Sequence, residues 1–141
     1  MFVFDGAAQT FLQYRATSPV VLSNLKTLKP GHAVWLFINN PDGTVWQQSR
    51  GDLLPAIQLQ AGANLVAWLG EDKVSVVDAV VSLGESVDKF FFWDPAKQGF
   101  LSFNPALPDS LAYLNTAQTL AFGIGIWLLM EQEATWEFAS P

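Results

Sequence analysis

The sequence predicts an α+β fold that is rich in strands: mainly antiparallel sheet, built from about one and a half copies of an internal repeat, with one principal helix. The chain has 141 residues, of which 50% are hydrophobic and 13% aromatic. This length and composition suit a single domain with a substantial core. Short apolar runs separated by turn residues indicate antiparallel strands. A match between residues 1–22 and 90–111 indicates the repeat, which constrains the architecture before any local pattern does.

The repeat is visible as identities between the two segments. The eight identical pairs are Phe2/Phe91, Asp5/Asp94, Ala7/Ala96, Gln9/Gln98, Phe11/Phe100, Leu12/Leu101, Pro19/Pro108 and Leu22/Leu111. Chance identity for ordinary composition is about one position in fifteen. After a three-residue slip the match resumes at Thr27/Thr119, Leu28/Leu120, Gly31/Gly123, Trp35/Trp127 and Leu36/Leu128, and Trp46 later falls opposite Trp136. We therefore expect one domain over 1–141, with a partial repeat unit over 1–52 and a complete unit over 53–141.

Two hairpins are expected in the first unit. Residues 1–4 and 11–14 are apolar runs on either side of a turn that begins at Asp5. Residues 33–38 and 44–48 form the second pair, around the sequence Asn-Asn-Pro-Asp-Gly, whose residues each favour turn geometry. Residues 49–55 are the expected seam between the units.

The second unit opens with elements that the first unit lacks. Residues 56–60 and 64–69 are expected strands. Residues 74–83 are interpreted as the principal helix, with a capping box at Ser75 and Asp78 and a terminal glycine at Gly84. The many valines keep a strand open as the alternative, because β-branched residues lower helix propensity.

The rest of the second unit repeats the first. The expected elements are strands at 90–93 and 100–103, a helical turn at 109–114 capped by Asp109, and strands at 125–129 and 135–138.

Charge and cysteine content narrow the function classes. The net charge is −6 and the seven basic residues are scattered singly, so no basic stripe exists to bind nucleic acid. The absence of cysteine excludes disulfides, thiolate metal sites and a cysteine nucleophile. The most apolar run, 120–130, is too short for a membrane-spanning helix. Met1 leads straight into a strand, so we expect a cytoplasmic protein if Met1 is a native start, and an extracellular or surface protein if the chain is part of a longer one.

Candidate functional residues are few. The tryptophans that recur in both units are interpreted mainly as core residues, because large aromatic side chains dominate core energetics. Trp46 and Trp136, near hairpin ends, are the candidate ligand contacts. Asp5 and Asp94 are interpreted as turn carboxylates that accept backbone N–H bonds. His32 is the single histidine, and there is no cysteine or second histidine to complete a metal site with it. No G-x-S-x-G motif for a nucleophile is present either. We therefore predict no catalytic residue, no metal ligand and no cofactor.

The complete unit resembles a repeat module of bacterial exported and surface proteins. The pattern is G-x-N-L-V-x-W-x-G over 62–70, then a helix, then Trp93-Asp94 with Gln98, Pro105 with Pro108, and Gly123 with Trp127. The resemblance covers 62–136, and residues 4–46 are similar to its second half. It implies a β-rich modular domain of unassigned function and supplies no catalytic residues.

These observations favour a non-catalytic binding or assembly module of bacterial type. The alternative is carbohydrate or small-ligand binding through an aromatic cleft, and a small hydrolase is the third reading. Because the first unit lacks its opening strand and helix, an uncovered strand edge or apolar face is expected there, and such edges favour pairing. The expected partner is a second copy, giving a homodimer, or another protein; a glycan is also considered, and neither nucleic acid nor a membrane span is expected.

Overall fold

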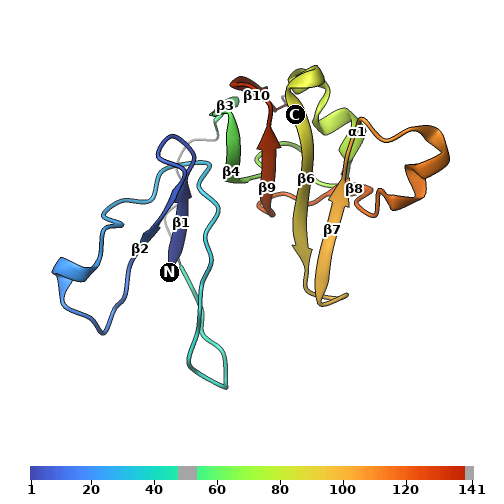
Figure 1. Cartoon of the computed structure of the whole chain (residues 1–141). Coiled ribbons are helices and arrows are strands. Elements are labelled where there is room, and N and C mark those ends of the chain that lie inside the picture. Colours follow the sequence, from blue (N-terminus) through green and yellow to red (C-terminus); the bar gives the residue numbers. More distant parts are fainter. Residues whose placement is uncertain (48–53, 139–141) are drawn as a thin grey trace.

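A computed structural model describes residues 1–47 and 54–138, and these form a β-rich fold with antiparallel sheets and few, short helices (Figure 1). The strands are β1 (Phe2–Asp5), β2 (Thr10–Gln13), β3 (Ala56–Leu59), β4 (Gly62–Ala67), β5 (Val74–Ser75), β6 (Val87–Asp94), β7 (Gly99–Phe103), β8 (Thr119–Leu120), β9 (Gly125–Met130) and β10 (Ala134–Glu137). The helical elements are α1 (Val76–Ala79) and the 3-10 turns η1 (Val20–Leu22), η2 (Val81–Ser86) and η3 (Asp109–Leu114). The predicted strand-rich α+β class is confirmed at this level.

The largest sheet has four antiparallel strands in the order β4-β9-β6-β7. Along β9 the side chains of Ile126, Leu128 and Met130 are buried, while those between them are more exposed. This alternation places one face of the sheet on the core, as the period of two of a strand requires. Smaller antiparallel pairs are β1 with β2, β3 with β10, and β5 with β8.

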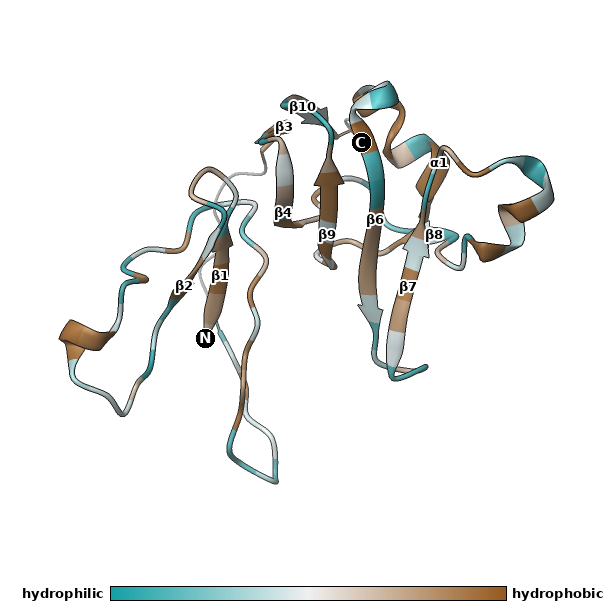
Figure 2. Ribbon diagram, in the orientation of Figure 1, coloured by the Kyte–Doolittle hydropathy of each residue, from teal (hydrophilic) through white to brown (hydrophobic). Residues whose placement is uncertain are grey.

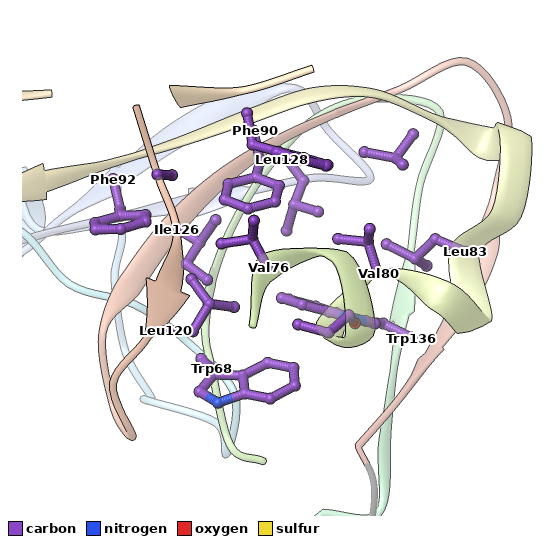
Figure 3. Packing of buried hydrophobic residues seen from close by; sticks show 14 of the residues in the cluster. Trp68, Val76, Val80, Leu83, Phe90, Phe92, Leu120, Ile126, Leu128 and Trp136 are labelled. Atoms are coloured by element: carbon purple, nitrogen blue, oxygen red, sulfur yellow. The ribbon is translucent and has the colours of Figure 1, made fainter. Parts of the chain in front are cut away.

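The core lies between this face of the sheet and the segment α1–η2 (Figure 3). Trp68 and Trp136 pack against one another with ring centroids 5.2 Å apart. Trp136 Nε1 donates to the Ala79 carbonyl at 2.6 Å, and Trp68 Nε1 donates to the Glu71 carbonyl at 2.8 Å. Both indoles therefore bury their large apolar surface without leaving a polar atom unpartnered.

Gly62, Asn64 and Gly70 each have a structural role in the segment 62–70. Gly62 has a φ of +87°, which side chains rarely adopt. The buried Asn64 accepts the Gln60 N–H at 3.0 Å and donates to the Gln60 carbonyl at 2.8 Å, closing the turn between β3 and β4. A Cβ at Gly70 would lie 2.3 Å from Trp68 Cζ2, so the indole occupies the space of a side chain there.

The helix predicted over 74–83 is shorter in the structure. Ser75 is the N-cap as predicted, with Oγ accepting the Asp78 N–H at 3.1 Å. The α-helix nevertheless spans only Val76–Ala79 and continues as the 3-10 segment η2, in which Gly84 has a φ of +53°. The strand alternative applies to Val74–Ser75, which pairs with β8. Branched side chains restrict helix formation here, and strand pairing with β8 offers the first two residues another arrangement.

The second predicted hairpin, over 33–38 and 44–48, is only partly formed. Its turn is present: Gly43 N–H donates to the Asn40 carbonyl at 3.0 Å. The two arms form no strand within residues 33–47, and Trp35 makes only an isolated antiparallel bridge to Phe2. A hairpin without further strands or a packed face is marginal in water, and nothing in the described chain pairs with the second arm. Residue 48 and most of the predicted seam, up to residue 53, lie outside the described residues.

The hairpins β1–β2 and β6–β7 have the same turn geometry. Asp5 pairs with Thr10 and Asp94 with Gly99 at the ends of the two ladders. Asp5 Oδ1 accepts the N–H groups of the residues two and three positions on, at 3.0 and 3.1 Å, and Asp94 Oδ1 does the same at 2.9 and 3.3 Å. The turn role predicted for both carboxylates is confirmed.

Further contacts recur beyond the hairpins, at positions that the sequence match pairs. Leu25 N–H donates to the Gln13 carbonyl at 3.0 Å, and Ala117 N–H donates to the Ser102 carbonyl at 3.0 Å. Gly31 and Gly123 have φ values of 83° and 80°. Trp35 bridges to Phe2, and Trp127 pairs with Phe91.

Candidate functional site

The two tryptophans proposed from the sequence as ligand contacts lie in different environments. Trp136 is 0% exposed and its N–H is satisfied within the core, so it offers no surface to a ligand in this structure. Trp46 is 45% exposed and lies in the second arm, after the turn at residues 40–43. The two side chains do not converge on one site.

A different set of aromatic side chains does converge. Eight rings follow one another in contact from residues 1–47 to the large sheet, and we name them the aromatic row. In order they are Phe37, Phe2, Phe11, Phe4, Trp127, Phe91, Phe100 and Trp93. Neighbouring ring centroids in the row lie 5.1–6.4 Å apart. The row therefore crosses from the β1–β2 hairpin to β9, β6 and β7 without a break.

Strand alternation places the sheet part of the row on the side opposite the core. Phe90 and Phe92 in β6 are buried in the core, so Phe91 between them points to the other face. Trp127 on β9 is the cross-strand partner of Phe91, with the two rings nearly parallel at 21°. Trp93 and Phe100 are likewise paired across β6 and β7, and both are exposed.

The other half of the row comes from the N-terminal hairpin. Phe4 lies against Trp127 at 5.1 Å, which joins the two halves. Phe11 and Phe37 are exposed, the latter by 77%. Hydrophobic residues colour much of β1 and β9 brown in Figure 2. Four of the eight rings in the row, those of Phe11, Phe37, Trp93 and Phe100, are thus exposed.

The rings of the row are mostly packed edge to face. Six of its seven neighbouring pairs have interplanar angles of 62–88° and one has 21°. This is the preferred geometry of aromatic pairs and stabilises the row itself.

Gln9 joins the N-terminal hairpin to the start of β4. Ala63 N–H donates to Gln9 Oε1 at 3.0 Å, and Gln9 Nε2 donates to the carbonyls of Ala63 and Gly6 at 2.8 and 2.6 Å. Its sequence counterpart, Gln98, donates only to the Pro95 carbonyl at 2.7 Å among the described contacts. Gln9 therefore fixes the hairpin against the sheet and so sets the join between the two halves of the aromatic row.

A cleft of about 320 Å³ lies beside this junction, between the N-terminal hairpin and β3–β4. It is lined by His32, Lys29 and Asp5 among others. Burial lowers the pKa of His32, the nearby Lys29 lowers it further, and Asp5 opposes both. His32 Nδ1 accepts the backbone N–H of Lys29 at 3.3 Å.

The cleft brings a histidine and an aspartate together, but none of the described residues that line it is a serine. The Ser-His-Asp arrangement therefore has no serine there. Within residues 1–47 and 54–138, no group of three or more histidine, aspartate or glutamate side chains could hold a metal ion. None of the described helices has the length and apolar character to cross a membrane.

Sequence reasoning did not find the aromatic row. Its signal is the alternation in residues 90–94, where Phe90 and Phe92 point inward while Phe91 and Trp93 point outward. That pattern indicates a strand with apolar side chains on both faces. The sequence pattern does not predict the contact of Trp127 with Phe4, because that contact depends on how the N-terminal hairpin packs on the sheet.

The sequence matches no family model. No curated protein and no solved structure is significantly similar to it.

Proposed function

We propose that this protein is a non-catalytic binding or assembly module that associates with a protein partner through the aromatic row. The supporting observation is the unbroken line of eight rings, with Phe11, Phe37, Trp93 and Phe100 exposed. Aromatic residues are enriched at protein interfaces because they bury much area at little conformational cost.

The module is proposed to consist of about one and a half repeat units, 1–52 and 53–141. Support comes from the matched turns at Asp5 and Asp94, and from the glycines Gly31 and Gly123 with nearly equal positive φ. The resemblance of 62–136 to a repeat module of bacterial exported and surface proteins agrees with this proposal. The aromatic row includes residues of both proposed units.

A second copy is the partner that we propose first. Light scattering on a dilution series of the purified chain gives the mass directly. The proposal expects a dimer that dissociates on dilution, and Phe100→Ser should shift the dissociation to at least about tenfold higher concentration, as expected for an interface anchor. The matched control is Val77→Ser, which removes an exposed apolar side chain outside the row. A monomer at every concentration would contradict the proposal. A dimer whose dissociation Phe100→Ser leaves unchanged would also contradict it.

Carbohydrate binding is the second candidate. Its support is Trp93, a partly exposed indole at the end of the row, since sugar rings stack on exposed aromatic faces. Titration of soluble glycans with tryptophan fluorescence as readout tests it, with Trp93→Ala as the matched variant. Quenching that survives this substitution would count against Trp93 as the sugar platform.

A further inference from the structure

Four apolar side chains of residues 1–47 are exposed at positions whose sequence counterparts form the core. We name Leu28, Leu36, Ile38 and Trp46 the open face. Their counterparts are Leu120, Leu128, Met130 and Trp136. Leu36 is 37% exposed and Leu128 0%, Ile38 is 50% exposed and Met130 4%, and Trp46 is 45% exposed and Trp136 0%. Similar side chains at matched positions are thus open in one part of the chain and closed in the other.

The structure shows what closes the second set. Strand β4 pairs with β9 along its whole length, from Gly62 opposite Met130 to Ala67 opposite Gly125. Strand β3 pairs with β10, and places Ile57 opposite Trp136. Above the sheet, Trp68 and α1 complete the cover, with Ala79 accepting the Trp136 N–H. All of these covering elements belong to residues 54–88, a strand-strand-helix segment.

The open face has no such cover in the described chain. Trp35 makes one bridge to Phe2 and His32 one bridge to Val66, while the arm at 44–47 forms no ladder. Residues 36–38 of the first arm therefore have backbone groups available for strand pairing beside exposed apolar side chains. This combination is the requirement for β-strand addition, in which backbone bonds give affinity and side-chain pockets give selectivity.

We propose that the open face binds a strand-strand-helix segment of the same design as residues 54–88, supplied by another polypeptide. The proposal rests on the repeat interpretation given under the proposed function. The donor would pair its second strand with residues 33–38 and place an apolar helical turn over Leu36 and Trp46.

A second copy of this chain is a poor donor. Its residues 54–88 already cover its own Leu128 and Trp136. Releasing that segment would expose the core of the donor, including the fully buried Leu120 and Ile126. The donor that we propose is a polypeptide whose strand-strand-helix segment is not already folded onto strands of its own.

The direct test is to fuse a second copy of residues 54–89 to Met1 of the full chain. Met1 is the counterpart of Phe90, so this junction reproduces the spacing that the chain already uses at 89–90. Hydrogen exchange of the amides at 33–47 is measured in the chain with and without the fused segment. The proposal expects exchange at 36–38 to slow at least about a hundredfold, because these amides become paired and buried.

Matched substitutions in the fused copy distinguish specific packing of the fused segment on the open face from nonspecific association. In the chain itself Val76 faces the core and is 3% exposed, whereas Val77 is 58% exposed, and the same two positions are substituted in the fused copy. Val76→Asp in the fused copy should abolish the protection and Val77→Asp should leave it unchanged. In the full chain, Leu36→Asp should also abolish it, while Val45→Thr should not, because the counterpart of Val45 is the exposed Thr135.

The supply from another polypeptide is tested with residues 54–89 attached to a soluble carrier and titrated onto the full chain. Saturable one-to-one binding, weakened at least about tenfold by Leu36→Asp and unaffected by Phe100→Ser, is the expected result. Unchanged exchange at 33–47 in the fusion would overturn the proposal, and so would a carrier-borne segment that fails to bind when the fusion is protected. Phe100→Ser reports on the aromatic row alone, so the failure of either proposal is seen separately.

Discussion

The paired leucines Leu36 and Leu128 give a quantitative prediction. Leu128→Ala removes a fully buried side chain from a packed cluster, and this type of change costs about 2–5 kcal/mol of unfolding free energy. Leu36 already has 37% of its surface in water and lies on an arm without strand partners, so Leu36→Ala should cost less than about 1 kcal/mol. The substitution is the same in both, so its effect on the unfolded chain largely cancels.

Urea unfolding followed by far-UV circular dichroism measures both variants. With a slope of about 2 kcal/mol per molar urea, Leu128→Ala should lower the midpoint by about 1–2.5 M and Leu36→Ala by less than about 0.5 M. Equal shifts for the two variants would refute the reasoning, because they would place Leu36 in an environment as closed as that of Leu128.

Three further predictions concern the junction and the core. Gln9→Ala should lower stability by about 1 kcal/mol more than Gln98→Ala, because only Gln9 bonds the edge of β4; urea midpoints that agree for the two would contradict this. Gly70→Ala should be far more destabilising than Gly99→Ala by thermal unfolding, since the added Cβ would lie 2.3 Å from an indole carbon in the first and 3.8 Å from the nearest atom in the second. Burial lowers the pKa of His32 from 6.5, so the unfolded chain binds this proton more tightly, and stability falls as pH drops below 6.5 until the lowered pKa is passed. His32→Gln should flatten that part of the stability profile, and an unchanged profile would exclude His32 as its cause.

Local patterns predicted the hairpins β1–β2 and β6–β7 and their turns. Asp5 and Asp94 cap equivalent turns, and Ser75 caps the helix, because these contacts lie within three residues of one another. Alternation along residues 125–130 likewise reveals which side chains face the core. These features depend on contacts between residues that are close in the sequence, so local patterns predict them.

The remaining features depend on partners that are distant in the chain. The arms at 33–38 and 44–47 have the composition of strands, yet they form none in the described residues, since strand pairing needs neighbours that only the C-terminal part possesses. From the sequence alone Trp136 is expected to lie exposed near a hairpin end, and its burial depends on its contact with α1. The aromatic row depends on the contact of Phe4 with Trp127, which joins residues far apart in sequence.

The central claim is that matched positions are open in residues 28–46 and closed in residues 120–136. Hydrogen exchange followed by mass spectrometry on the unmodified chain measures this directly, by comparing the amides of 36–38 with those of 128–130. The account predicts exchange of 36–38 within seconds and protection of 128–130 for hours, because β9 is bonded on both edges and the first arm is not. Similar, strong protection of both segments would contradict the account.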